Sequence, residues 1–360
     1  MTRYIFSSVT RISDLPEGDF SVEPLPRGAW EMGDYVVGHV VGGAGEDLTI
    51  ELPNGRMIEA AESDLIVGAF GKRHATLDAT GDWEAIGPEG LFHALTEGGL
   101  FGKCLSRSPY VKPLMSLDYR GHALRNSTKV RMQDCAARAA GAAGAAGAAA
   151  PAFTTPIVLL IGSSMSAGKT TTSRIIIRLL KSSGRRVLAA KLNGAGRYHD
   201  VLTMADAGAD AIFDFVDAGL PSTVCSAEDY RQALRPLLSR MATVAADVAV
   251  IEIGSSPLEP YNGAVTIKEI GRNVRVTILC ASDPYAVLGV MSAFEVQPDL
   301  VTGIVANTGA GRELVEKLSS VRALNLKEPE ALPELMALLR KKLWGEDPPA
   351  FSPWVIWTGL

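Results

Sequence analysis

The segment that most constrains this chain begins at Ile157 and runs Ile-Val-Leu-Leu-Ile-Gly-Ser-Ser-Met-Ser-Ala-Gly-Lys-Thr-Thr. Its apolar beginning is short enough for a buried strand, a glycine- and serine-rich turn follows, and residues 173–181 have the periodicity of a helix. In that order, backbone N–H groups of the turn and of the helix N-terminus point toward a bound anion, which the helix dipole also favours. The segment therefore predicts a phosphate-binding loop between a strand and a helix.

Each position of this loop has an expected part in holding a phosphorylated cofactor. Lys169 is expected to reach the terminal phosphates, and Thr170 to ligate Mg²⁺ through its hydroxyl. Five residues separate Gly162 from Gly168, which is longer than the common spacing, and Ser163 stands where the first glycine usually is. A chance strand–turn–helix of the same composition is the alternative. The expected cofactor-binding residues of the loop are Gly162, Ser163, Ser164, Met165, Ser166, Ala167, Gly168, Lys169, Thr170 and Thr171.

The sequence after residue 152 alternates between strand and helix patterns. The candidate strands are 157–161, 187–191, 248–252, 275–280 and 301–306, and the candidate helices are 169–182, 228–244, 284–296, 311–319 and 330–343. This alternation predicts an α/β domain at 153–345, with helices on both faces of a parallel sheet, and a C-terminal tail at 346–360. Because ligands of such sheets bind beyond the carboxyl ends of the strands, we expect the residues that follow the strands to meet at one site.

The sequence before residue 136 predicts a smaller, mostly-β domain at 1–135. Residues 49–52 and 56–59 alternate in polarity around Pro-Asn-Gly, which is typical of a β-hairpin. Repeated short strands with glycine between them favour a small barrel or a sandwich. Residues 136–152 are rich in alanine and glycine, so we expect an interdomain linker there, either a frayed helix or a flexible connector.

The composition restricts the class of partner. Apolar residues make up 47% of the chain, charged residues 21%, and the formal net charge is −5, as in ordinary globular proteins. Without a basic stripe, nucleic acid is not expected to be the principal partner. No uncharged apolar run approaches the roughly 20 residues of a membrane span, so no membrane partner is expected. Four scattered cysteines and an N-terminus without a signal-peptide pattern predict a cytoplasmic protein with reduced thiols.

The second candidate strand and the loop after it carry side chains suited to phosphoryl transfer. Lys191 ends the strand, where its ammonium would stabilise charge that develops in phosphoryl or carboxyl transfer; a solvated strand-end lysine is the alternative. Asp200 is a candidate Mg²⁺ ligand, because hard cations prefer carboxylate oxygens. Arg197 is a candidate for holding an anionic substrate group, or is simply exposed. His199 is a candidate base, or a packing residue.

Two later strands also end in polar residues. Glu252 ends the third strand, and a carboxylate in an apolar strand is costly to leave unpaired. Opposite a phosphate-binding loop, we expect it to serve as a partner of Mg²⁺ or water. Asn307 ends the fifth strand, where its amide is suited to the edge of a nucleobase or, alternatively, to an Asx turn.

Together, these motifs resemble the dethiobiotin synthetase superfamily of P-loop proteins. The longer loop has that family's spacing, Lys191 stands where the family has its catalytic lysine, and Asp200 and Glu252 match its Mg²⁺-binding acids. The segment Val305-Ala-Asn307 matches the segment with which the family binds adenine. The resemblance covers residues 156–310 and implies a P-loop NTPase fold, ATP and Mg²⁺ as cofactors, and a homodimer.

The resemblance also implies roles for individual residues. Lys169 and Lys191 are the implied catalytic residues. The loop after the third strand contacts the small substrate in that family, which makes Ser255 a candidate for substrate binding beside Arg197 and His199. In this loop the chain departs from the family, because Glu252-Ile-Gly-Ser-Ser-Pro stands where the family has Glu-Gly-Ala-Gly-Gly.

A second family is similar in domain order and in the segment 210–219: the P-loop proteins that include D-glutamate N-acetyltransferases. Members of that group can hold the phosphates of an acyl-CoA in the loop. The leading hypothesis is an ATP- and Mg²⁺-dependent, ligase- or synthetase-like enzyme that activates a carboxylate or carbamate of a small metabolite. The alternatives are an acyltransferase that binds acetyl-CoA and a nucleotide-switched protein that binds a partner.

Overall fold

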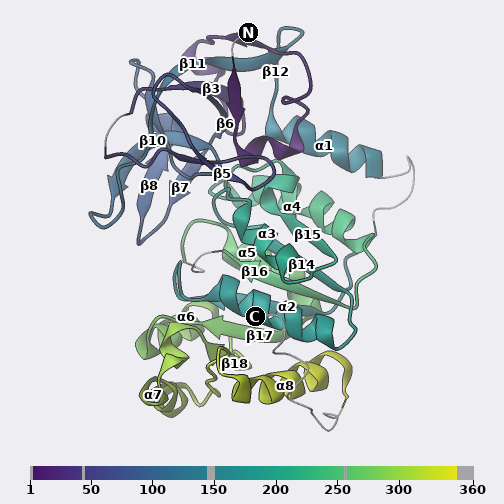
Figure 1. The fold of residues 1–360 in the computed structure, drawn as a ribbon. Coiled ribbons are helices and arrows are strands. Elements are labelled where there is room, and N and C mark those ends of the chain that lie inside the picture. Colours follow the sequence, from purple (N-terminus) through teal and green to yellow (C-terminus); the bar gives the residue numbers. More distant parts are fainter. Residues whose placement is uncertain (1–2, 43–44, 144–150, 255, 257, 347–360) are drawn as a thin grey trace. The chain divides into compact units, whose positions relative to one another are not determined.

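The chain folds into two compact units, neither of which is continuous in sequence (Figure 1). The computed structural model describes residues 3–42, 45–143, 151–254, 256 and 258–346. The first unit is made of Met1–Ala150, Gly194–His199 and Asp214–Arg240, and the second of Pro151–Asn193, Asp200–Phe213 and Met241–Leu360. The predicted boundary at 136–152 separates most of the two units, but it does not account for the two later segments that fold with the first.

Part of the predicted linker is helical. Helix α1 spans Met132–Ala143, so the first half of 136–152 continues a helix that begins before it. The alanines explain this, since alanine has the highest helix propensity. Residues 144–150 lie outside the described residues, as do all but the first residue of the predicted tail at 346–360.

The first unit is built on a β-sheet that closes on itself. Its described strands in that sheet are β1 (Tyr4–Phe6), β2 (Ser21–Glu23), β3 (Tyr35–Val40), β6 (Leu65–Phe70), β7 (Lys72–His74), β8 (Ala79–Asp82), β9 (Leu91–Ala94), β10 (Leu100–Arg107), β11 (Ser116–Arg125) and β12 (Thr128–Lys129). Antiparallel pairs connect β6, β3, β11, β9 and β10 in that order, and a parallel pair of β10 with β6 completes the ring. The sequence favours a barrel or a sandwich, and this pairing is that of a barrel.

Large apolar side chains from opposite sides of the ring fill the barrel. Val36, Phe70, Phe92 and Phe101 are all fully buried in one cluster. Gly38 leaves room for this packing, because a Cβ at that position would lie 2.8 Å from the Phe92 ring. The predicted hairpin is confirmed beside the barrel, as β4 (Thr49–Glu51) paired antiparallel with β5 (Met57–Glu59).

A buried ion cluster lies where the three segments of the first unit meet. The described helical elements of this unit are η1 (Ser8–Ile12), η2 (Arg27–Ala29), η3 (Trp83–Ala85), α1, η4 (Phe215–Ala218) and most of α4 (Ala227–Ala242). The Arg11 guanidinium pairs with Asp214 at 2.5 Å and with Asp217 at 3.1 Å, and lies 4.4 Å from the centre of the Tyr198 ring. Residues far apart in sequence are thereby fixed by one cation.

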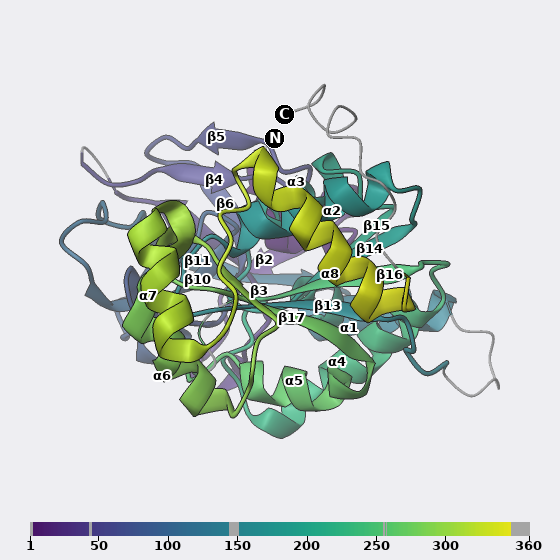
Figure 2. The ribbon, with the colours of Figure 1, turned by 90° about the horizontal axis from the view of Figure 1, so that it is seen from below.

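The second unit has the α/β architecture expected from the sequence. Its sheet has the order β15-β14-β16-β13-β17-β18, and each pair whose register is given is parallel. The strands are β13 (Ile157–Gly162), β14 (Val187–Asn193), β15 (Ala211–Asp214), β16 (Val248–Ile253), β17 (Val274–Cys280) and β18 (Leu300–Thr302). The helices are α2 (Lys169–Ser182), α3 (His199–Asp206), α5 (Gly263–Ile270), α6 (Pro284–Phe294), α7 (Gly309–Ser319) and α8 (Leu332–Trp344). Figure 2 shows α2 and α8 on one face of the sheet and α5 on the other.

The fifth predicted strand is wrong over its second half. β18 ends at Thr302, and the expected strand residues after it form the 3₁₀ helix η6 (Ile304–Asn307) instead. The reason is Gly303, whose φ of +93° turns the chain out of the extended conformation. Every helix in the described part of the chain is too short or too polar to span a bilayer.

Candidate functional site

The candidate site lies at the carboxyl ends of three neighbouring strands in the second unit. β16 is central among them: Glu252 is in register with Leu160 of β13 on one side and with Lys191 of β14 on the other. Strand β13 ends two residues after Leu160, at Gly162, and the turn before α2 follows. The parallel sheet therefore brings Lys191, Glu252 and the beginning of the predicted phosphate-binding loop to one edge, as the sequence predicts.

The loop at 162–168 has the backbone of a P-loop. Gly168 has a φ of +104°, directly before the first residue of α2. Gly162 leaves room for the lysine, because a Cβ there would lie 2.7 Å from Nζ and 2.8 Å from Cδ of Lys169. The Lys169 ammonium donates a hydrogen bond of 2.8 Å to the carbonyl of Ser164. The lysine is thus folded back over the loop that precedes it.

Other segments of the second unit support this loop from behind. Ala167 is fully buried, and its carbonyl oxygen would lie 2.2 Å from a Cβ at Gly303. Gly168 and Gly303 also approach closely, since a Cβ at Gly168 would lie 3.2 Å from the Cα of Gly303. At the other end, the Ser163 N–H donates to the carbonyl of Cys280 at 3.0 Å. Two further strand ends, of β17 and β18, therefore set the position of the loop.

Glu252 is a buried carboxylate facing the first turn of α2. Its side chain accepts a long hydrogen bond of 3.4 Å from the Thr170 hydroxyl, and the residue is 2% exposed. Burial raises the pKa of Glu252, against the attraction of Lys191 and Lys169. Burial likewise lowers the pKa of Lys169, against the attraction of Glu252. Each charge is therefore poorly solvated, and this edge of the sheet favours a ligand that supplies charge of its own.

Lys191 forms an ion pair with Asp200, the second residue of α3. The Lys191 side chain is 10% exposed and that of Asp200 is 20% exposed, so the pair is largely shielded from water. The alternative of a solvated strand-end lysine is therefore wrong. Lys191, Asp200, Glu252, Lys169 and Thr170 all belong to the second unit, and the structure brings these predicted residues together.

Asn193 is a residue of this site that the sequence does not single out. It is fully buried at the end of β14. Its Oδ1 accepts from the N–H of Gly254 at 2.7 Å, and its Nδ2 donates to the carbonyl of Tyr261 at 3.1 Å. Asn193 therefore ties the end of β14 to the loop after Glu252. An asparagine two positions after a strand-end lysine is the only sequence signal for it.

The predicted substrate residues, and Asn307, which is predicted to bind the cofactor, are placed differently. Arg197 and His199 fold with the first unit, where Arg197 lies 3.6 Å from Glu97 and the His199 N–H donates to Glu51. Ser255 lies outside the described residues. Asn307 is exposed at the end of η6, immediately before Thr308 caps α7.

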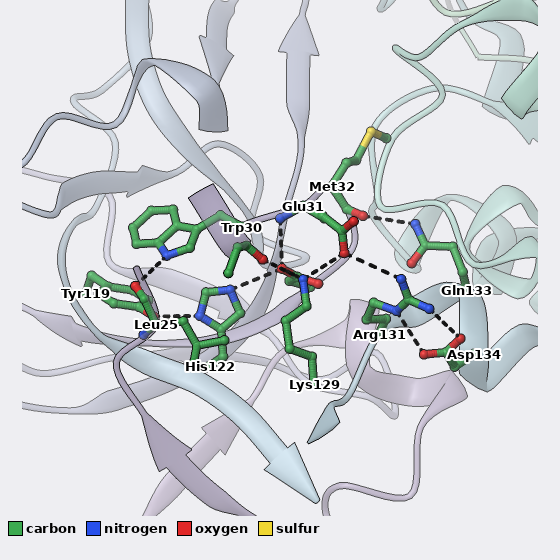
Figure 3. A network of polar contacts seen from close by, with 12 residues as sticks. Leu25, Trp30, Glu31, Met32, Tyr119, His122, Lys129, Arg131, Gln133 and Asp134 are labelled. Carbon is green, nitrogen blue, oxygen red and sulfur yellow. Dashed lines mark hydrogen bonds and ion pairs between the residues drawn. The ribbon is translucent and has the colours of Figure 1, made fainter. Parts of the chain in front are cut away.

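A second polar network, around His122 of β11, lies in the first unit (Figure 3). Its Nε2 is 3.1 Å from a carboxylate oxygen of Asp34, which also accepts from Lys129 at 2.9 Å. Its Nδ1 is 2.5 Å from the Tyr119 hydroxyl, which in turn accepts the N–H of Leu25 at 3.0 Å. Because both ring nitrogens have partners and His122 is fully buried, this network fastens strands and loops of the barrel to one another.

No protein-family model matches this chain, and no curated protein matches it. Among solved structures, HypB from Helicobacter pylori with nickel is 16% identical, covers 56% of this chain and 92% of its own, and has a TM-score of 0.36. Cobyrinic acid a,c-diamide synthase from Mycobacterium smegmatis, with an ATP analog and magnesium, is 18% identical and has a TM-score of 0.36. The match covers 55% of this chain and 100% of the synthase chain. A de novo designed protein with a P-loop NTPase fold is 16% identical and has a TM-score of 0.28. The match covers 52% of this chain and 93% of the designed chain.

These likenesses are too low to bear on function. The P-loop NTPase fold of the second unit follows from this chain's own sheet order and from the loop between β13 and α2. The resemblance to the dethiobiotin synthetase superfamily stays a prediction.

Proposed function

We propose that the second unit binds ATP and Mg²⁺, and that the protein is a ligase- or synthetase-like enzyme that activates a carboxylate or carbamate of a small metabolite. The observation that carries this proposal is the ion pair of Lys191 with Asp200, one strand away from Glu252. A nucleotide-switched protein needs the loop and a Mg²⁺ partner, but it has no need of a second buried lysine beside them. A transferring phosphoryl group does need one, because charge on its oxygens must be stabilised.

The oxygen donors near the loop fit Mg²⁺. The Thr170 hydroxyl and the Glu252 carboxylate lie 3.4 Å apart, and both are hard donors. Mg²⁺ usually keeps several waters and takes one or two carboxylates together with substrate phosphates. The described residues contain no cluster of three or more His, Cys, Asp or Glu side chains that could hold a metal. Bound Mg²⁺ would neutralise charge on the phosphates, with Thr170, Glu252 and Asp200 as its protein partners.

The two lysines would contact different parts of the triphosphate. Lys169, at the beginning of α2, would exchange its bond to the Ser164 carbonyl for a phosphate oxygen. Lys191 would donate to the phosphoryl group in transit while an oxygen of the substrate carboxylate attacks the terminal phosphorus. The bond from that phosphorus to the bridging oxygen breaks, ADP leaves, and an acyl phosphate results. Asp200 would hold the Lys191 ammonium toward the reacting group through their ion pair.

A comparison of melting temperatures with ATP, GTP and acetyl-CoA, each with Mg²⁺, tests the ligand. A ligand at a hundred times its Kd stabilises the folded protein by about 2.7 kcal/mol, and we expect this stabilisation from ATP. Stabilisation by acetyl-CoA and not by ATP would overturn the proposal in favour of an acyltransferase. Stabilisation by GTP alone would favour the nucleotide-switched alternative.

Replacement of Lys191 by alanine tests the chemistry. We expect Lys191→Ala to lower turnover at least about tenfold, or about 1.4 kcal/mol of barrier, with ATP affinity nearly unchanged, because Lys169 and the loop hold the nucleotide. ADP release and ATP titration measure the two quantities. Lys268→Ala on α5 is the matched control, since Lys268 is exposed. Unchanged turnover in Lys191→Ala would remove the assigned role.

A further inference from the structure

Helix α6 of the second unit presents an uncharged face at the surface. Its sequence, Pro-Tyr-Ala-Val-Leu-Gly-Val-Met-Ser-Ala-Phe, contains no charged residue. Val287 and Val290 are the buried positions of the helix. The exposed positions are Tyr285, Leu288, Gly289, Ser292 and Ala293. Because these positions are spaced by three and four residues, they form one stripe along α6.

Large apolar side chains are exposed on this helix and on its neighbours. Tyr285 is 70% exposed and Leu288 is 37% exposed. Helix α7 packs against both α6 and η6 (Figure 1), and it carries the exposed Leu318, while η6 carries the exposed Ile304. The outer face of a surface helix is ordinarily charged or polar. Several exposed apolar side chains on adjoining elements therefore indicate a surface that contacts another protein.

Gly289 is a feature of α6 that the fold of this chain does not require. A glycine inside a helix costs about 1 kcal/mol relative to alanine. A Cβ at Gly289 would have no described atom of another element within 4 Å, so intramolecular packing leaves room for a side chain there. Gly289 is also the central residue of α6, the sixth of eleven. Its missing side chain would let a second backbone approach the middle of the helix closely.

We propose that two copies of this chain associate through α6, with the two helices crossing at Gly289 about a two-fold axis. In a two-fold interface a face meets its own copy, so any charge on it would face the same sign. The stripe on α6 carries no charge and is therefore complementary to itself. Asp283 and Glu295, the charged residues that flank the helix, cap its two ends. Helices that cross at an angle keep such ends apart.

Analytical ultracentrifugation of the full chain at micromolar concentration tests this association. We expect the wild type to sediment as a dimer. Gly289→Arg should raise the Kd of the dimer at least about a hundredfold, because the new side chain would lie between the two backbones at the crossing point. Gly271→Arg is the matched control: Gly271 is also exposed, a Cβ there has nothing within 4 Å, and this variant should dimerise as the wild type does.

A cysteine at the same position tests where the helices cross. A two-fold axis at Gly289 brings the two copies of this position close enough for a disulfide. Mild oxidation of Gly289→Cys should therefore join the two protomers, and mass spectrometry should identify a crosslink between two identical peptides that contain position 289. Gly271→Cys, oxidised in the same way, should form no such crosslink at its own position.

Three results would overturn the proposal. They are a monomeric wild type, a Gly289→Arg protein that dimerises as tightly as the wild type, and a dimeric Gly289→Cys protein without the crosslink. Circular dichroism checks that each variant is folded. If Gly289→Arg is not folded, Tyr285→Ser replaces it, since this ring is largely exposed, and it must weaken dimerisation as well. The measurements use no nucleotide, so their outcome is independent of the proposed function.

Discussion

Replacement of Gly303 by alanine tests whether the segment after β18 supports the P-loop. Gly303 has φ and ψ of +93° and −154°, a region in which other residues are strained by about 1–3 kcal/mol. A Cβ there would lie 2.2 Å from the carbonyl oxygen of Ala167 and 3.1 Å from backbone atoms of Ala281. Because these are backbone atoms, no side-chain rotation removes the overlap. We expect Gly303→Ala to lower the free energy of unfolding by at least about 3 kcal/mol.

The same substitution should weaken nucleotide binding, because Ala167 belongs to the loop. We expect the Kd for ATP to rise at least about tenfold, or about 1.4 kcal/mol. Urea unfolding and ATP titration measure the two effects. The control is Gly271→Ala: Gly271 has a φ of −54° and nothing within 4 Å of a Cβ, so this variant should gain between about 0 and 1 kcal/mol. A Gly303→Ala protein within about 0.5 kcal/mol of the wild type, with normal ATP affinity, would refute the reasoning.

Two other changes probe the loop and the core behind it. In Gly162→Ala the new methyl group meets the flexible end of Lys169, so titration with ATP should show at least about tenfold weaker binding with a loss of stability under about 1 kcal/mol; unchanged affinity would contradict the assigned path of the lysine. Burial raises the pKa of Cys280 to about 11. At pH 8, iodoacetamide should therefore label native Cys280 at least about a hundredfold more slowly than the same thiol in urea, and faster as the pH rises toward 11. Rapid labelling of Cys280 itself in the native protein at pH 8 would show that this thiol is accessible.

Local signals in the sequence are enough to predict much of the second unit. The helix predicted at 169–182 is α2, because a glycine turn marks where it begins and an amphipathic repeat runs along it. Buried parallel strands such as β13 and β16 are continuous apolar runs, which are visible without tertiary information. The short elements β15 and α5 were not predicted, since a four-residue strand and an eight-residue helix depend on packing more than on their own sequences.

The residues of the candidate site also fall into two groups: those that local sequence signals predict and those that they do not. Lys191 and Glu252 could be predicted, because the carboxyl ends of parallel strands converge whatever the rest of the chain does. Asn193 could not, because its partners Gly254 and Tyr261 lie 61 and 68 positions away in sequence. A buried polar residue in a short strand has no local pattern that distinguishes it from an ordinary strand residue.

The charges at the site suggest how the ion pair takes part in turnover. Two lysines, Lys169 and Lys191, stand beside two carboxylates, Asp200 and Glu252, so the cluster of these four is balanced before any ligand binds. Under the proposed function, Asp200 would serve both as a partner of Mg²⁺ and as the carboxylate that orients the Lys191 ammonium. It follows that Asp200→Asn should impair Mg²⁺ dependence and turnover together, whereas Lys191→Ala should impair turnover alone.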